Sequence, residues 1–288
     1  MATESNLVTW SNDNADTETN DSIRRKSRAE IMRDYDVRTI DRRTYLKELR
    51  AERRNKPPTH KTLLGPTHRG KTTLELQELH EEISPEKQAI LLSAKPPHRD
   101  PVMNKAAEQL NLTIIDHWPP SMYETRRAKW KNKNGWVVRP EQTLSDLDRD
   151  HHNVRQHFRA AMLDAYSTKD PLIIVHDEAH KIYNVYGLKK EYEAPLMSGL
   201  PDNASHSLIQ RGRYMPYLAY DAPENLVIFN DPDLSNQKRY AEIGGVDPYV
   251  VISITKGLKT YETDQGFTIS EFLHIRRAGP RLTVVDIT

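Results

Sequence analysis

The sequence predicts an α/β fold in which helices flank a mostly parallel central sheet, and three observations support this. After Pro57-Pro58, short apolar runs alternate with helix-compatible stretches, as expected for a parallel sheet covered by helices. The run PLIIVHDE, 171–178, stays apolar almost to its end, which is typical of a strand buried on both faces. A glycine-containing segment lies directly between the first apolar run and a helix-compatible stretch. We therefore expect one α/β domain over 58–288.

Two segments precede this domain. Residues 1–21 are mainly Asn, Asp, Thr, Ser and Glu, so they have little to bury, and we expect a disordered acidic tail. Residues 22–57 are predicted to form a basic helical extension of one or two helices attached to the core. From Ser22 to Lys56 the sequence counts 13 Lys or Arg against 6 Asp or Glu. The prolines end this extension because proline removes a backbone donor.

Within the domain the pattern predicts the order of strands and helices. The expected strands are 60–65, 88–94, 112–118, 171–178, 216–222, 225–230 and 248–254, followed by a C-terminal hairpin over 266–288. The expected helices are 71–82, 100–110 and 141–166. Residues 121–140 are polar, basic and aromatic, so we expect an inserted basic loop or hairpin there rather than a core element.

Composition excludes some classes of protein. The formal net charge is +1, and the chain has no cysteine, so disulfide frameworks and thiolate metal sites are excluded. No stretch approaches the roughly 18 apolar residues of a membrane span, and the N-terminus lacks the pattern of a secretory signal. We expect a cytoplasmic protein, in a bacterium or in the host cytoplasm if a phage encodes it.

The segment Gly65–Thr72, GPTHRGKT, matches the phosphate-binding pattern G-x-x-x-x-G-K-[ST] in the required place between a strand and a helix. Backbone N–H groups and the helix N-terminus would hold a polyphosphate, Lys71 would contact its β- and γ-phosphates, and the Thr72 hydroxyl would bind Mg²⁺. The residues expected to bind nucleotide are Gly65, Pro66, Thr67, His68, Arg69, Gly70, Lys71, Thr72 and Thr73.

Two adjacent carboxylates end the most apolar strand, at the edge where ligands of open α/β sheets bind. We expect Asp177 to hold hydrated Mg²⁺ and Glu178 to polarise the attacking water. Together the motifs predict a P-loop NTPase with a RecA-like sheet. About a hundred residues separate them, so a further strand is expected between the two motif strands, as in the additional-strand, catalytic-glutamate class.

Other segments resemble FtsK/HerA-type ATPases, in the compact form of phages and actinobacterial mobile elements. They are LLSAKPPHRDP, HDEAHKIY and LIQRGRYMPYLAYDAPENLVIF, and the resemblance covers roughly 60–255. It implies that Arg213, with Arg211 as alternate, reaches the nucleotide of a neighbouring subunit, so that Lys71, Glu178 and Arg213 are the catalytic set. Where that family has a polar Thr-Gln sensor, this chain reads AYDAP at 219–223.

The resemblance implies an ATPase that uses ATP and Mg²⁺ to translocate or package double-stranded DNA as a homo-oligomeric ring. DNA contacts are expected from the basic extension and from Trp130 and Trp136, which are interleaved with lysines. Both basic segments can also be solvated faces, and the N-terminal helix can instead dock a portal or another assembly partner. The alternative function is a P-loop adaptor or switch that binds ATP and scarcely hydrolyses it.

Overall fold

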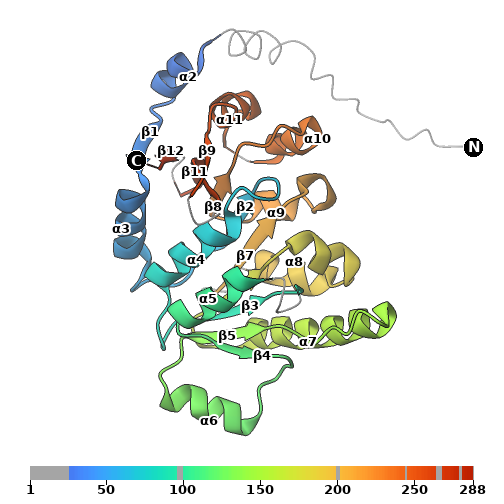
Figure 1. Ribbon diagram of the computed structural model, residues 1–288. Coiled ribbons are helices and arrows are strands. Elements are labelled where there is room, and N and C mark those ends of the chain that lie inside the picture. Colours follow the sequence, from blue (N-terminus) through green and yellow to red (C-terminus); the bar gives the residue numbers. More distant parts are fainter. Residues whose placement is uncertain are drawn as a thin grey trace, which may run out of the picture.

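The computed structural model describes residues 26–95, 100–198, 202–243, 245–263, 268–278 and 281–287; the tail expected at 1–21 lies outside this part. A ten-stranded sheet forms the centre of the molecule, in the order β1-β12-β11-β8-β2-β7-β6-β3-β5-β4 (Figure 1). Its strands are β1 (Arg38–Asp41), β2 (Lys61–Leu64), β3 (Gln88–Leu92), β4 (Thr113–Ile115), β5 (Gly135–Val138), β6 (Leu172–His176), β7 (Asn203–Ile209), β8 (Asn225–Ile228), β11 (Phe272–Arg276) and β12 (Arg281–Asp286).

The sheet is mostly parallel, as the sequence predicts. All neighbouring pairs from β8 across to β4 are parallel. In the described sheet β11 alone runs the other way, because it pairs antiparallel with both β8 and β12. The C-terminal ends of β2, β6 and β7 therefore meet at one edge of the sheet.

Helices cover both faces. They are α2 (Arg28–Asp34), α3 (Arg42–Arg53), α4 (Lys71–Glu82), α5 (Pro101–Gln109), α6 (Met122–Trp130), α7 (Leu147–Ser167), α8 (Lys189–Ser198), α9 (Leu218–Asp221), α10 (Leu234–Gln237) and α11 (Pro248–Thr255). Successive strand residues point to opposite faces, so Leu63 packs with the layer of α3, α4 and α5, whereas Leu64 packs with that of α7, α8 and α11. Two cores result, one on each side of the sheet.

A strand does lie between β2 and β6, as expected, but it is β7, which follows both motifs in the chain. The sequence pattern of β7, NASHSLI, is too polar to stand out, although all seven residues are buried. Asn203, Ser205 and His206 are among the buried polar residues, and the side chain of each forms a hydrogen bond. Burial of satisfied polar side chains hides a central strand from a hydrophobicity pattern.

The expectation of a basic inserted loop over 121–140 is wrong. Residues 122–130 form α6, and β5 is a fully buried strand between β3 and β4. Gly135 is needed there because a Cβ would lie 2.0 Å from the carbonyl oxygen of Ala89. Trp136 is therefore a core residue at 8% exposure, and Trp130 is exposed.

Two expected strands are helices instead. PYLAYDA contains α9, and PYVVISI is α11, which begins after the N-cap Asp247 and has Pro248 at its first position. Proline is favoured there because its missing N–H has no partner in the helix. A short apolar run does not by itself distinguish a buried helix from a strand. The helix expected over 141–166 begins only at Leu147.

The N-terminal extension is not purely helical. Between its helices α2 and α3, β1 pairs parallel with β12 and so extends the main sheet. At the C-terminus, β11 and β12 form the expected antiparallel hairpin, while β9 (Thr260–Glu262) and β10 (Thr268–Ser270) pair separately. No helix in the described ranges has the length and apolarity that a membrane span requires.

Buried charges join α3, α4 and the sheet. Lys61, at 1% exposure, forms ion pairs with Glu75 at 2.7 Å and with Glu78 at 2.5 Å. His206 Nδ1 lies 2.7 Å from Glu75, and the Tyr45 hydroxyl donates to Glu78 at 2.8 Å. Because both carboxylates belong to α4, this network fixes the helix that follows the phosphate-binding segment.

Candidate functional site

The segment Gly65–Thr72 forms the turn between β2 and α4, as predicted. Gly70 is the N-cap of α4 with φ +76°, and a Cβ at this position would lie 2.6 Å from the carbonyl oxygen of Thr268. Glycine tolerates this left-handed backbone and the close approach. Because no side chain caps α4, its first N–H groups are free of side-chain acceptors, as an anion site requires.

Lys71 lies inside the turn. Its ammonium donates to the carbonyl oxygens of Gly65 and Pro66, each at 2.6 Å. Burial lowers the pKa of Lys71 to about 8, although the nearby Asp177 carboxylate opposes this shift. The side chain is thus a buried cation held by the carbonyls of the segment that is expected to wrap a polyphosphate.

Asp177 faces this turn from the end of β6. The Thr72 hydroxyl lies 3.3 Å from Asp177 Oδ1, so the two expected magnesium ligands are neighbours. A hydroxyl and a carboxylate are the oxygen ligands that Mg²⁺ uses in proteins, so this pair fits the ion chemically. Burial raises the pKa of Asp177.

Lys95 is a member of this site that the sequence did not single out. It follows β3, and its ammonium lies 2.9 Å from Asp177 Oδ2. Its positive charge opposes the effect of burial on the pKa of Asp177. The sequence does show that Lys95 follows a buried strand. Because neighbouring parallel strands end at the same edge of a sheet, and β3 pairs with β6, Lys95 lies near the carboxylates that follow β6.

Glu178 has an unusual backbone, with φ +60°. Such a conformation is strained for a residue other than glycine, and strain of this kind is concentrated at functional sites. The carboxylate forms an ion pair with Lys181 and accepts a hydrogen bond from Gln210 Nε2 at 3.2 Å. Burial raises the pKa of Glu178, but Lys181 and Gln210 outweigh it, and the pKa is lowered overall.

AYDAP at 219–223 was expected to stand where the resembled family has a polar Thr-Gln sensor, but the polar side chain that reaches the Glu178 carboxylate is Gln210. It directly follows β7, the strand between β2 and β6, and so its amide reaches Glu178. It also accepts a hydrogen bond from the Thr67 hydroxyl at 3.3 Å, which links it to the phosphate-binding segment. The AYDAP segment at 219–223 that was expected at this place contains the end of α9 and is not a strand.

The remaining expected ligands lie around the turn. Arg69 donates to the Thr260 hydroxyl of β9 at 2.7 Å, His68 has φ +60°, and Thr73 belongs to the first turn of α4. Arg69 and Gly70 thus both contact the β9–β10 hairpin. The hairpin was not expected to take part in the site.

Arg211 and Arg213 follow Gln210 in the chain and both are exposed, and neither forms an ion pair with Asp177 or Glu178 within the described ranges. Arg213 belongs to a short 3₁₀ helix, Gly212–Tyr214, and its guanidinium stacks on the Tyr214 ring at 4.7 Å. Its backbone N–H donates to Asn236 at 3.2 Å. The structure therefore brings Lys71, Thr72, Asp177 and Glu178 together and leaves Arg213 on the surface.

Solved structures with a similar fold include two viral packaging enzymes. The DNA-packaging ATPase B204 of Sulfolobus turreted icosahedral virus matches with a TM-score of 0.53 and 13% identity, over 81% of this chain and 99% of that chain. The genome-packaging NTPase B204 of Sulfolobus turreted icosahedral virus 2 in complex with AMPPCP matches with a TM-score of 0.51 and 12% identity, over 81% and 98%. The fold is that of a P-loop NTPase.

In this fold Gly65–Thr72 lies after a central strand and before a helix, which is the setting that a phosphate-binding turn requires. A third structure, the B204 enzyme of the second virus with ATP-gammaS, has a TM-score of 0.51 at 13% identity. No protein-family model matches this chain. No curated protein matches it significantly.

Proposed function

We propose that this protein is a Mg²⁺-dependent ATPase that translocates or packages double-stranded DNA. The observation that carries the proposal is the convergence of Thr72, Asp177 and Glu178 at the C-terminal edge of β2 and β6, with Gln210 from the strand between them. Phosphoryl transfer needs a positioned nucleophile and stabilised charge more than covalent chemistry. This cluster offers both beside a turn suited to a polyphosphate.

Each residue has a distinct task in the proposal. The N–H groups of the turn and the Lys71 ammonium bind the phosphates, and Thr72 and Asp177 hold Mg²⁺, which would neutralise phosphate charge. Glu178 orients the attacking water, and Gln210 and Lys181 fix its carboxylate. The lowered pKa of Glu178 keeps it ionised, so it can accept a hydrogen bond from water.

The partners in the proposal are duplex DNA and further copies of this chain. The matched B204 proteins are described as DNA-packaging and genome-packaging enzymes, which supports the same class of task here. Arg213 is exposed and its guanidinium stacks on Tyr214 rather than pairing with Glu178, a position that suits an arginine acting on the nucleotide of the next subunit in a ring. We also propose a cytoplasmic location and a role for the N-terminal helices in docking an assembly partner.

Steady-state ATP hydrolysis by the full chain, with and without duplex DNA at low salt, tests the proposal. We expect Mg²⁺-dependent turnover that DNA stimulates and that Lys71→Ala abolishes. Nucleotide binding with no turnover under any of these conditions would instead support the adaptor or switch. Turnover that DNA leaves unchanged would remove the translocase assignment.

Subunit mixing tests the role of Arg213. Lys71→Ala subunits retain the arginine, and Arg213→Ala subunits retain the phosphate-binding lysine. If the arginine acts across an interface, mixing the two inactive variants restores part of the activity. If mixtures are no more active than the sum of their parts, Arg213 does not act in trans.

A further inference from the structure

Helix α6 lies at the sheet end that carries β4 and β5 (Figure 1). Of its nine residues, Ala128 alone is buried. Capping holds the helix start, since the Ser121 N–H donates to Glu124 at 2.7 Å and the Ser121 side chain accepts from the Glu124 N–H. Nearly all of the helix surface is therefore accessible.

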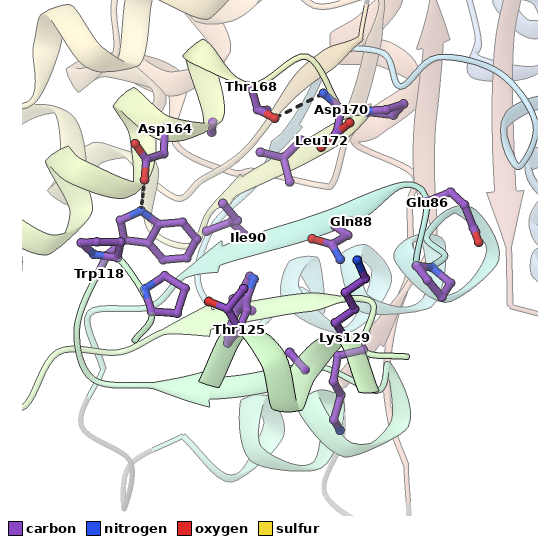
Figure 2. Close-up of a pocket in the computed structure, with 18 of the residues that line it drawn as sticks. Glu86, Gln88, Ile90, Trp118, Thr125, Lys129, Asp164, Thr168, Asp170 and Leu172 are labelled. Carbon is purple, nitrogen blue, oxygen red and sulfur yellow. Dashed lines mark hydrogen bonds between the residues drawn. The ribbon is translucent and has the colours of Figure 1, made fainter. Parts of the chain in front are cut away.

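The inner side of α6 faces a cavity of about 870 Å³ between the helix and the sheet (Figure 2). Thr125, Ala128 and Lys129 line this cavity from the helix. Opposite them lie Trp118 and Trp136, in edge-to-face contact at 6.4 Å, and the Trp118 indole N–H donates to Asp164 at 2.7 Å. Trp118 is half-buried and Trp136 is buried, so neither belongs to the outer side of α6.

The outer side of α6 carries two aromatic residues and two arginines. Tyr123, Arg126, Arg127 and Trp130 are spaced i, i+3, i+4 and i+7, and therefore share one stripe. Tyr123 is 71% exposed and Trp130 is 82% exposed. An aromatic stripe of this kind on the solvent side indicates a surface that binds another molecule.

The charge around the stripe is almost entirely positive. The cations on or beside the outer side are Arg126, Arg127 and Lys131, whereas Lys129 and Lys133 line the cavity, and none of the five forms an ion pair with a described residue. The one carboxylate of residues 121–134, Glu124, is engaged by Ser121 and by His117 Nε2 at 3.2 Å. These cations are therefore available to a polyanion.

The basic N-terminal extension differs in this respect. Several of its arginines are paired within the chain, namely Arg38 with Glu48, Arg50 with Glu81, and Arg53 with Glu82. Arg42 donates to Gln77 at 2.9 Å. A smaller share of its described basic residues is therefore free of ion pairs than at α6, and this favours α6 as the anion-binding surface.

We propose that the outer face of α6 is a duplex-DNA contact, in which Arg126 and Arg127 bind phosphates and Tyr123 and Trp130 pack against the groove. The proposal rests on the proposed function and specifies the surface that engages the DNA. The DNA major groove admits an α-helix, and arginine forks match phosphate oxygens. Exposed aromatic rings beside arginines suit a duplex groove better than a carboxylate-rich peptide, because the groove presents apolar sugar edges next to its phosphates.

Fluorescence anisotropy of the full chain with a labelled duplex tests this surface. Arg126→Ala/Arg127→Ala should weaken binding about tenfold or more at low salt and lower the slope of log K against log salt by about 1 to 2, since each phosphate contact contributes about 0.9. Trp130→Ala should also weaken binding, and Trp130→Phe should restore most of it. Duplex binding should change the fluorescence of the wild type more than that of Trp130→Phe.

Lys190→Ala/Lys256→Ala is the matched control, because it removes two charges from exposed positions at α8 and α11. This control should change the affinity for duplex DNA and the slope of log K against log salt much less than Arg126→Ala/Arg127→Ala does. Thermal unfolding checks that the α6 variants remain folded, as expected for exposed positions. Equal weakening by both double variants, or by neither, would overturn the proposal.

Two further outcomes are distinguishable. If the wild type binds duplex DNA and is stimulated by it, and the α6 variants behave identically, the inference fails and the proposed function stands. If the wild type neither binds DNA nor responds to it, the proposed function is wrong, and the inference about α6 is wrong with it. Binding of polyglutamate as tightly as duplex through the same residues would overturn the nucleic-acid assignment in favour of an acidic protein.

Discussion

The Lys95 ammonium lies 2.9 Å from Asp177 Oδ2, so the carboxylate proposed to hold Mg²⁺ is paired with a cation from the segment that follows β3. Without this charge, burial alone would raise the pKa of Asp177 further. Lys95→Met should therefore raise the Mg²⁺ concentration for half-maximal turnover by roughly tenfold. Replacing a side chain that pairs with a metal ligand commonly weakens metal binding by at least this much. Nucleotide binding in EDTA should change little.

Two measurements separate the effect on Mg²⁺ from the effect on nucleotide binding. They are a Mg²⁺ titration in the hydrolysis assay and a fluorescence assay of nucleotide binding. Lys181→Met is the control, because Lys181 pairs with Glu178 and not with Asp177. It should affect turnover and leave the Mg²⁺ midpoint in place. An identical midpoint shift in both variants would show that Lys95 has no specific relation to Asp177.

Gln210 and Glu178 should behave as one unit in catalysis. Glu178→Gln should retain nucleotide and abolish hydrolysis, and Gln210→Ala should lower kcat by about 10- to 100-fold with little change in nucleotide affinity. In a Glu178→Gln background, Gln210→Ala should have no additional effect, because its amide acts through that carboxylate.

Single-turnover kinetics and binding of a non-hydrolysable analogue measure this cycle. Gln77→Ala, which removes an amide that accepts from Arg42, is a control far from the carboxylate and should leave kcat unchanged. Additive losses for Gln210 and Glu178 would argue that the two side chains act independently.

Gly70 and Gly187 allow backbone strain to be separated from steric clash. Their φ values are +76° and +64°, but a Cβ on Gly70 meets the Thr268 carbonyl oxygen at 2.6 Å, and a Cβ on Gly187 meets nothing within 4 Å. Gly187→Ala should cost only the strain, about 1 kcal/mol. Gly70→Ala should cost more and lower turnover by about a hundredfold, since it displaces the turn.

Urea unfolding and nucleotide binding of both variants check this prediction. The comparison reports directly on the contact between the β9–β10 hairpin and the turn. Equal stability losses and intact nucleotide binding in both variants would mean that the hairpin does not constrain Gly70.

Glu75 should make stability depend on pH in the acid range. Burial tends to raise the pKa of Glu75, but Lys61, helped by His206, outweighs it and lowers the pKa to about 2 from its ordinary 4.5. Between these values the unfolded chain binds a proton that the folded chain does not. The contribution of Glu75 is therefore complete above pH 4.5 and is lost as the pH falls toward 2.

Glu75→Gln should cost about 3 kcal/mol near neutral pH, because it removes one partner of a buried ion pair. That cost should shrink by up to about 1.4 kcal/mol per pH unit below pH 4.5. Urea unfolding between pH 3 and 7 measures it. Glu48→Gln, which breaks a surface pair with Arg38, should change stability by less than about 0.5 kcal/mol throughout, and a pH-independent cost for Glu75→Gln would contradict the assignment.

The sequence by itself determined the parts of the site that are contiguous in the chain. Gly65–Thr72 between its strand and helix, and Asp177-Glu178 at the end of β6, could be predicted because a local pattern specifies both the residues and their setting. That the two motifs end at one edge also followed, since parallel strands in such a sheet end together.

Only the tertiary structure decided which strands are neighbours and which way ambiguous segments fold. β7 lies between the motif strands, and Lys95 and Gln210 reach the carboxylates because of pairings across the sheet. GWVV became a buried strand and PYVVISI a helix because long-range packing, and not local periodicity, satisfies their backbone and side chains. The two tryptophans of 121–140 show the same limit, since Trp136 fills the core and Trp130 faces solvent.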